Sequence, residues 1–344
     1  MNTDDLTPDF FSRILETEVS AVRCERVGTG MVGLNVRCSL DYRDAGTGPR
    51  SLVVKLPSDD PTSRATGVAM RNYEREVRFY SDLADTVDVR SPRCFHAALA
   101  SDDSFVLVLE DINWGEQGNQ ITGCNEGEAS AALRELAALH APRWADPTLD
   151  DIEWLGRRTV DTVAQLQGLY ALFVSPFLDR YGSSLDAAQT QVVHDLGQAL
   201  PRYIDAFDGP YTLTHGDFRL DNMLFSTSPG HDPVVVVDWQ TPGHGSPGND
   251  LAYFLGACMP AAGRRRHEDA LIAGYHAELV ARGVTGWSLA ECQHVERIGS
   301  LAGVIMSVVA SQIVERTERG DEMFVAMATR HTSHALDRRA LDAL

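Results

Sequence analysis

The strongest chemical pattern in the sequence is an H-G-D-x-x-x-x-N motif at residues 215–222, which four valines and then Asp238 follow. Phosphoryl transfer needs a carboxylate that orients the attacking hydroxyl and accepts its proton, and oxygen ligands that hold Mg²⁺ on the phosphates. We therefore expect Asp217 to act as the base. Asn222 and Asp238 are the expected metal ligands, and Arg219 is placed to reach the transferring phosphoryl group. The alternative is that these are turn residues that cap short strands.

A glycine-rich loop lies near the N-terminus, far ahead of this motif in the sequence. Residues 28–33 read G-T-G-M-V-G, and the residues after them alternate between apolar and polar types as in a half-buried strand. A dinucleotide-binding fold needs a helix at that point, so the pattern does not fit one. We expect instead a hairpin in which Gly28, Gly30 and Gly33 let backbone N–H groups cover nucleotide phosphates. A plain glycine-rich turn is the alternative.

A lone lysine lies beyond this loop. Of thirty basic residues only Lys55 is a lysine, and it ends an apolar strand-like run. A compact ammonium at this place is suited to the α- and β-phosphates of a nucleotide. Either Glu74 or Glu76, on the helix predicted over 71–83, could pair with it, and we favour Glu76 because the apolar face at 77–83 lies beside it. The alternative is a solvated helix face.

Composition narrows the range of partners. The chain has 344 residues with 44% apolar and 23% charged residues, and its formal net charge is −19. This charge argues against a nucleic acid or an anionic membrane as the main partner, because both need a positive surface. The apolar stretch 298–314 is too short and too interrupted for a membrane span and predicts a buried helix. Six cysteines without a C-x-x-C pair and an N-terminus without a signal-peptide pattern favour a cytoplasmic protein with reduced thiols.

The periodicity of the chain changes along its length. Residues 1–112 are rich in strand-like alternation, and a polar, glycine-rich stretch at 113–123 follows. Beyond it, helical patterns predominate, with short strands only between 211 and 239. We predict an α+β, two-lobed fold, with a small β-rich nucleotide-binding lobe at 1–112 and a large, mainly helical lobe at 113–344. The predicted helices of the second lobe are 126–140, 160–181, 186–207, 264–282, 288–316 and 323–341.

Four stretches carry a family resemblance: VLEDI at 108–112, LAALHAPRW at 136–144, HGDFRLDN at 215–222 and DWQTPGHGSPGNDLAYFL at 238–255. Through them the chain resembles the aminoglycoside phosphotransferase and choline kinase branch of the protein kinase-like superfamily, over nearly its whole length. Within that branch it is most similar to the ecdysteroid kinase-like phosphotransferases, including their bacterial members.

The resemblance implies further roles. ATP and Mg²⁺ would be the cofactors, and the backbone between Glu110 and Ile112 would meet the adenine. Asp250 would brace the catalytic loop, and His215 would support that loop rather than react. One departure concerns Gln240, because many antibiotic kinases and choline kinases have an acidic residue there. The glutamine agrees with the ecdysteroid kinase-like pattern and weakens the case for an antibiotic substrate.

Two spacings indicate the acceptor class. Only twelve positions separate Asp238 from Asp250, and no A-P-E element of a protein kinase follows. Predicted helices between Glu110 and His215 could instead cover an acceptor site. We therefore expect an ATP- and Mg²⁺-dependent transfer to a hydroxyl of a small molecule, which stays open between an antibiotic, an amino alcohol and a lipophilic, steroid-like alcohol. A nucleotide-binding pseudokinase and, less favoured, a protein Ser/Thr kinase remain as alternatives, and no oligomeric state is predicted.

Overall fold

The computed structural model describes residues 2–28, 33–44, 46, 48–100, 104–157, 159–207 and 209–344, and it divides into two compact units. The first contains the chain up to Asp85, Ser91–Trp114 and Val237–Thr241. The second contains Thr86–Arg90, Gly115–Val236 and Pro242 to the end. The segment with Asp238 therefore packs with the N-terminal unit, although it lies far along the chain. The lobe boundary after Ile112 stays a prediction.

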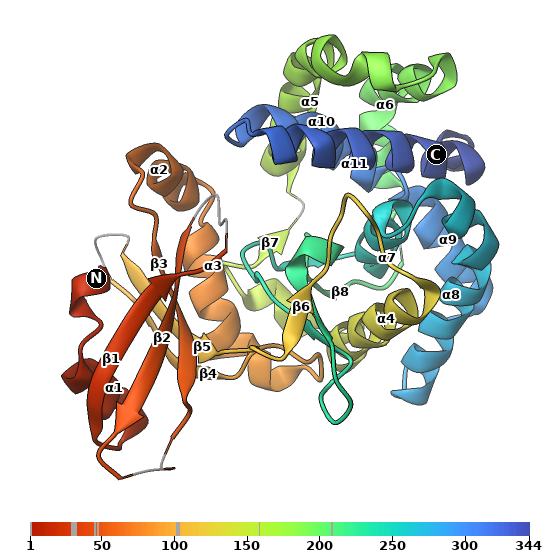
Figure 1. Cartoon of the computed structure of the whole chain (residues 1–344). Helices are drawn as coiled ribbons and strands as arrows, with labels where there is room; N and C mark the ends of the chain where they lie inside the picture. The colour runs from red at the N-terminus through yellow and green to blue at the C-terminus, as the bar shows by residue number, and fades with distance from the viewer. Residues whose placement is uncertain are drawn as a thin grey trace. The chain divides into compact units, whose positions relative to one another are not determined.

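An antiparallel sheet of five strands forms the centre of the first unit, in the order β1-β2-β3-β5-β4 (Figure 1). Along most of β2 and in the first part of β3, buried residues alternate with less buried ones, because successive side chains point to opposite faces. From Val54 to Pro57 every residue of β3 is buried. The strands are β1 (Val19–Arg26), β2 (Gly33–Tyr42), β3 (Ser51–Pro57), β4 (Cys94–Leu99) and β5 (Phe105–Glu110).

Helices cover the two faces of this sheet. Helix α1 (Pro8–Leu15) begins at Thr7, whose Oγ1 accepts a hydrogen bond from the N–H of Phe10, and Pro8 occupies its first turn. Its phenylalanines are buried with the apolar residues of β2 and β3 that face it. Helices α2 (Pro61–Ala69) and α3 (Asn72–Arg78) follow β3, and a π-helical turn at Phe79–Leu83 continues α3.

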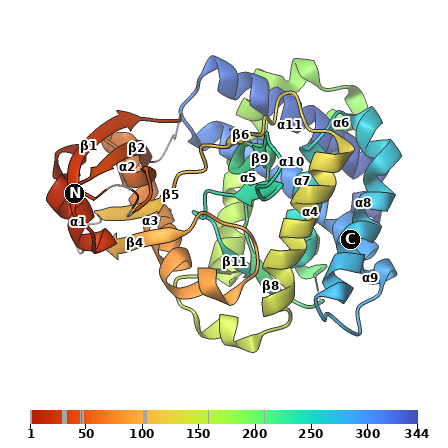
Figure 2. The same cartoon turned by 60° about the horizontal axis from the view of Figure 1, so that its bottom comes forward.

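The second unit is mainly helical. Its long helices are α4 (Glu126–His140), α5 (Val160–Tyr181), α6 (Ala187–Asp205), α7 (Pro247–Ala257), α8 (Ala261–Ala281), α9 (Leu289–Gly299), α10 (Ala302–Ile313) and α11 (Glu318–Asp337). Helices α5 and α6 share an apolar core with α7, α10 and α11, and α4 lies beside α8 (Figure 2). Within the described residues, every helix falls short of the length or the apolar character that a membrane span requires.

Two small sheets complete this unit. One contains β6 (Gly115–Gln117), β9 (Met223–Ser226) and β10 (Val234–Val236), and the other contains β7 (Gly156–Arg157), β8 (Thr212–Thr214) and β11 (Gly243–Gly245). The predicted α+β class, β-rich toward the N-terminus and helical beyond, is therefore confirmed.

Several details differ from the sequence patterns. Strands β6, β7 and β11 lie outside the range predicted for short strands, and α7 is absent from the predicted helices. A single helix predicted over 288–316 is wrong, because α9 ends at Gly299 and α10 starts at Ala302. The apolar period continues across the break, but Ser300 Oγ donates to the carbonyl of Arg297 at 2.8 Å and competes with the backbone donors there. Helix α2 was not predicted, although Asp60 followed by a proline is a helix-start signal.

The imidazole of His331 on α11 lies in a slot between Gly303 of α10 and Gly256 of α7, where the three helices come close together. A Cβ added to Gly303 of α10 would lie 2.0 Å from His331 Nδ1, and one added to Gly256 of α7 would lie 2.4 Å from the same atom. The imidazole also stacks on the ring of Tyr253, with centroids 5.3 Å apart and planes at 3°. Burial, followed by the neighbouring His334, lowers the pKa of His331 to about 3, so the ring is neutral in the folded protein.

This slot predicts opposite effects for two similar substitutions. Gly303→Ala forces a methyl group onto His331 and should lower the free energy of unfolding by about 1–3 kcal/mol. Gly274→Ala, on α8, meets nothing within 4 Å and should raise it by up to about 1 kcal/mol, because alanine favours helix. Urea denaturation of both variants measures the difference. Equal stabilisation by both would show that the slot is not closed as described.

Candidate functional site

Lys55 is the centre of a charged cluster in the first unit. It lies on β3 opposite Leu107 of β5, on the face of the sheet that α3 approaches, and only 9% of the residue is exposed. Its Nζ donates to Oε1 of Glu76, which is fully buried on α3, and to Oδ1 of Asp238 at 3.2 Å. The structure thus brings together three predicted site residues from distant parts of the chain.

Electrostatics keep this lysine charged. Burial lowers the pKa of Lys55, but the carboxylates of Glu76 and Asp238 outweigh burial, and the pKa lies above its ordinary value. A buried ammonium without such partners would lose its proton or destabilise the fold. Glu76 and Asp238 therefore keep Lys55 positively charged on the face of the sheet that α3 approaches.

The two candidate glutamates of the helix take different partners. Glu74 accepts two hydrogen bonds from the guanidinium of Arg71, at 2.8 and 3.1 Å, and lies toward the exposed side of α3. Glu76 is the one that contacts Lys55. The difference arises because Glu76 shares the buried side of α3 with Tyr73 and Val77.

Trp239 anchors the Asp238 segment to the first unit. Its fully buried indole stacks on the ring of Phe79 at a centroid distance of 3.8 Å with planes at 3°. Asp238 itself has φ 67°, a left-handed conformation that aspartate tolerates better than most residues. Gln240 Nε2 donates to Oε2 of Glu76 at 3.4 Å. An acidic residue at 240 would face that carboxylate with a like charge, which gives a physical reason for the glutamine.

The glycine loop is described only at its ends. Gly28 has φ 72°, where a side chain would be strained, and a Cβ on Gly33 would lie 3.3 Å from the carbonyl oxygen of Leu56. Gly30 lies outside the described residues. The backbone at both ends of the loop thus favours glycine.

The predicted adenine-binding segment follows β5. Glu110 Oε2 accepts a hydrogen bond from the N–H of Arg93 at 3.1 Å, and Ile112 is buried. Between them, Asp111 accepts two hydrogen bonds from Arg37 of β2, at 2.8 and 3.1 Å. This ion pair, which the sequence gave no reason to expect, fixes the segment against the sheet.

In the second unit, Asp250 holds the start of the H-G-D loop. This aspartate lies in the first turn of α7, and its two oxygens accept hydrogen bonds from the N–H groups of His215 at 2.7 Å and Gly216 at 3.0 Å. Burial raises the pKa of Asp250, but His140 and His215 outweigh it and the net pKa is lowered. Asp250 therefore stays ionised and fixes the backbone just before Asp217.

Asp217 is held from three sides. Asn222 Nδ2 donates to its Oδ2 at 2.8 Å and to its carbonyl oxygen at 2.9 Å. Arg219 Nε donates to Oδ2 at 3.0 Å, and the hydroxyl of Tyr253 donates to Oδ1 at 3.1 Å. Because Asn222 uses its amide nitrogen on Asp217, Oδ1 of Asn222 is the atom that could ligate a metal.

Arg219 lies between two carboxylates. Its guanidinium also donates to Asp221 at 3.0 Å, and Asp221 in turn accepts from the N–H of Gln120 and from Arg319. Burial lowers the pKa of Arg219, but the surrounding groups, Asp217 first, raise it overall. Arg219 is therefore fixed beside the candidate base by its ion pairs.

Sequence reasoning missed Tyr253 and Trp239. A signal for Tyr253 existed, since it lies three residues after Asp250 and therefore on the same side of α7. Burial first and then the charge of Asp217 raise the pKa of Tyr253, which keeps its hydroxyl protonated as a donor. No comparable signal marked Trp239, because its partner Phe79 lies far away in the sequence.

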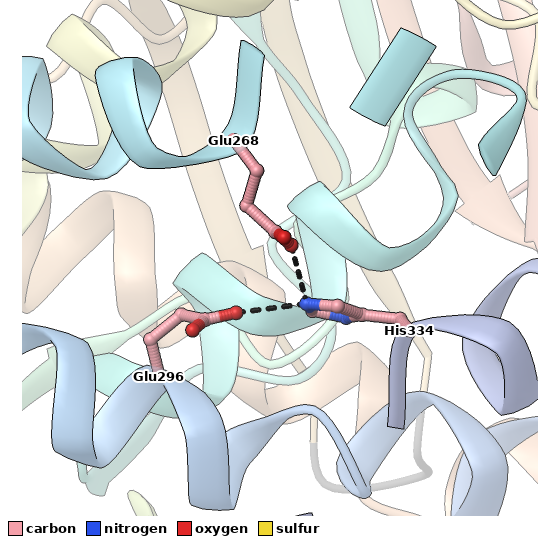
Figure 3. Close-up of side chains that lie close together, drawn as sticks. All are labelled: Glu268, Glu296 and His334. Atoms are coloured by element: carbon pink, nitrogen blue, oxygen red, sulfur yellow. Dashed lines mark ion pairs between the residues drawn. The ribbon is translucent and has the colours of Figure 1, made fainter. Parts of the chain in front are cut away.

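A third cluster has the residue types of a metal site. Glu268 of α8, Glu296 of α9 and His334 of α11 point toward one another and offer ligand atoms within 4.8 Å (Figure 3). His334 Nε2 lies 2.7 Å from Glu268 Oε1 and 2.8 Å from Glu296 Oε1. Arg264 donates to both oxygens of Glu268, and Arg338 donates to Glu296 at 2.7 and 2.5 Å. The arginines already balance the carboxylates, so the cluster is an ion-pair network that joins three helices.

Comparison with known proteins gives a family match over the middle of the chain. Residues 162–283 match the model of the ecdysteroid kinase-like family, a range that includes the 215–222 motif and Asp250. Acyl-CoA dehydrogenase family member 11 of Rattus norvegicus is 29% identical over 131 residues, which are 31% of this chain and 17% of the rat protein. The matched stretch thus covers less than a fifth of that relative's length.

Solved structures match nearly the whole chain. Choline kinase from Cryptosporidium parvum superposes with a TM-score of 0.61 at 11% identity, over 93% of this chain and 89% of that one. The GDP complex of aminoglycoside 2'-phosphotransferase-IIIa gives 0.51 at 15% identity, over 95% and 99%. The fold is therefore protein kinase-like. The predicted resemblance to the aminoglycoside phosphotransferase and choline kinase branch, and within it to the ecdysteroid kinase-like family, is confirmed.

The contact between Gln240 and Glu76 predicts a charge-specific effect. Gln240→Glu places a second carboxylate beside buried Glu76 and should lower the free energy of unfolding by about 1–3 kcal/mol at pH 7. The loss should shrink toward pH 5, because a proton shared by the two carboxyl groups binds with a raised pKa and removes the repulsion.

Gln191→Glu is the matched control for this substitution. Gln191 donates to Asp195 at 2.7 Å on the exposed face of α6, so its change should cost no more than about 0.5 kcal/mol. Denaturant titrations at both pH values measure the two variants. Similar costs for both would contradict the buried contact.

Proposed function

We propose that this chain, with its protein kinase-like fold, transfers the γ-phosphoryl group of ATP to a hydroxyl group of a small molecule in a Mg²⁺-dependent reaction. The observation that carries the proposal is the bonding of Lys55 to both Glu76 and Asp238. A pseudokinase would need only part of such a set, and here the lysine, the candidate base and the candidate metal ligands are all present.

Phosphate binding is assigned to the first unit. Lys55 is held charged by two carboxylates, so its ammonium can neutralise phosphate oxygens. The candidate ligands of Mg²⁺ are a carboxylate oxygen of Asp238 in the first unit and the amide oxygen of Asn222 in the second, because Mg²⁺ prefers hard oxygen atoms of this kind. When bound, the metal would neutralise charge on the phosphates.

Proton transfer is assigned to Asp217. An oxygen of a carboxylate can accept two hydrogen bonds, so Oδ1, which accepts from Tyr253, can also accept from the hydroxyl of an acceptor. The bonds from Asn222 and Arg219 to Oδ2 keep the carboxylate from rotating. A fixed orientation of the base favours transfer because less freedom has to be lost in the transition state.

A small acceptor fits the short connection after Asp238. The residues between it and Asp250 are taken up by β11 and the start of α7, where a protein kinase has a long activation segment. Choline kinase and an aminoglycoside phosphotransferase, two proteins of this fold, are named for small polar acceptors that carry amines. The net charge of −19 also favours a neutral or cationic acceptor.

The test of this function is a screen of small alcohols for ATP consumption, with detection of products that gain about 80 Da, the mass of a phosphoryl group. On an acceptor found this way, Asp217→Ala should lower kcat by about 10²–10⁴-fold, because no base orients the hydroxyl. Nucleotide binding, measured by calorimetry, should change little.

Lys55→Ala should show the complementary behaviour and weaken nucleotide binding. If the unchanged protein binds ATP but phosphorylates no alcohol in a broad panel, the pseudokinase alternative holds. Full turnover by Asp217→Ala would remove that residue from the chemistry.

Tyr253 is expected to act as a positioning residue for Asp217. Tyr253→Phe keeps the ring that stacks on His331 but removes one hydrogen bond to the base, so kcat should fall about tenfold with KM for ATP unchanged. Tyr170→Phe is the control, since it removes a buried bond to the carbonyl of Val193 on another helix and should leave kcat unchanged. Equal effects of both variants on kcat would mean that Tyr253 matters only for stability.

A further inference from the structure

Two cysteines face each other across the first hairpin of the sheet. Cys24 of β1 and Cys38 of β2 occupy directly opposite positions in the register, and their Sγ atoms lie 2.8 Å apart. Both belong to the first unit, and neither touches the groups assigned to phosphate binding or proton transfer. The pair therefore needs an account of its own.

The register shows that this position suits a cross-strand disulfide. The N–H of Val27 donates to the carbonyl of Asn35 at 2.9 Å, which makes those two residues a hydrogen-bonded pair. Hydrogen-bonded and non-hydrogen-bonded pairs alternate along an antiparallel ladder, and Cys24–Cys38 is three steps away, so it is a non-hydrogen-bonded pair.

In pairs of that kind the side chains come closer together and the Cα atoms are about 4.5 Å apart, within the range that a disulfide bridges. Bond formation would therefore need no shift of the two strands relative to each other.

The two thiols differ in their environment. Cys24 is on the exposed edge strand, whereas Cys38 is fully buried with the residues that α1 covers. Burial first, and then the adjacent Cys24, raise the pKa of Cys38 well above its usual value. An oxidant in solution therefore reaches Cys24, and Cys38 is the protected partner behind it.

We propose that Cys24 and Cys38 form a reversible, peroxide-driven disulfide that joins β1 to β2. The thiolate of Cys24 attacks a peroxide oxygen and breaks the O–O bond, which gives a sulfenic acid and releases hydroxide. The thiol of Cys38 then attacks the Cys24 sulfur, and water leaves as the S–S bond forms. Two thiols lose two electrons in total, and the peroxide gains them. A dithiol reverses the reaction by exchange.

The ring that closes contains residues 25–37 and therefore both ends of the glycine loop, Gly28 and Gly33. Oxidation thus ties together the strands on either side of that loop. The disulfide itself does not depend on the proposed transfer reaction, because it is read from thiol chemistry and stability alone.

The test uses the full chain with hydrogen peroxide as the probe. After brief oxidation, free thiols are alkylated and the protein is digested for mass spectrometry. We expect one linked peptide that joins Cys24 to Cys38 and is about 2 Da lighter than the two thiol peptides together. Dithiothreitol should abolish the link. The oxidised protein should melt a few degrees higher than the reduced one, because the ring restricts the unfolded chain.

Variants separate the two thiol roles. In Cys38→Ala the sulfenic acid of Cys24 has no partner and should be trapped by dimedone in several-fold greater yield than in the unchanged protein. Cys94→Ser, which changes a cysteine on β4, should leave the link intact. If Cys38→Ala does not fold, the peptide map of the unchanged protein decides alone. The inference is overturned if Cys38 stays alkylatable while Cys24 oxidises, or if Cys24 links instead to another cysteine.

Discussion

The first unit depends on one buried ion pair, between Lys55 on β3 and Glu76 on α3. Removing either partner of such a pair leaves a buried charge uncompensated, which typically costs ~3–5 kcal/mol. The same pair determines what can surround it. Asp238 adds a second carboxylate on the lysine side, and Gln240 adds an amide donor on the glutamate side, so each charge meets its complement. The stacking of Trp239 on Phe79 then holds a segment from far along the chain against the sheet.

In the second unit a carboxylate again holds the structure in place, but its partners are backbone N–H groups. Asp250 accepts from two consecutive N–H groups and so fixes the chain immediately before Asp217. The candidate base is then held by Asn222, Arg219 and Tyr253, whose polar groups come from the loop and from α7. A base that is fixed in this way loses little freedom when an acceptor arrives, which is the advantage that rigid positioning gives to proton transfer.

Tyr253 connects the candidate base to the helical core, because it belongs to that core and donates a hydrogen bond to Asp217. The same tyrosine stacks on His331, whose slot is formed by glycines of α7 and α10. Beside it on α11, His334 joins the ion-pair network of Glu268 and Glu296, where burial lowers its pKa but the two carboxylates raise it overall. One histidine is thus kept neutral and the other favours the charged form within one turn of helix, because the first has no carboxylate beside it among the described residues.

Local sequence was enough for much of the fold and for the types of residue at the candidate site. Alternation and capping signals identified most strands and helices, and the H-G-D-x-x-x-x-N spacing places Asp217 and Asn222 on one short loop whatever the rest of the chain does. Contacts between distant segments could not be read in this way. The sequence favoured Glu76 over Glu74 as the partner of Lys55, and the buried face of α3 decides for it. The contacts of Gln240 with Glu76 and of Tyr253 with Asp217 follow only from the packing of distant segments. Burial is a property of the packed chain, since each face becomes an interior only when another element covers it.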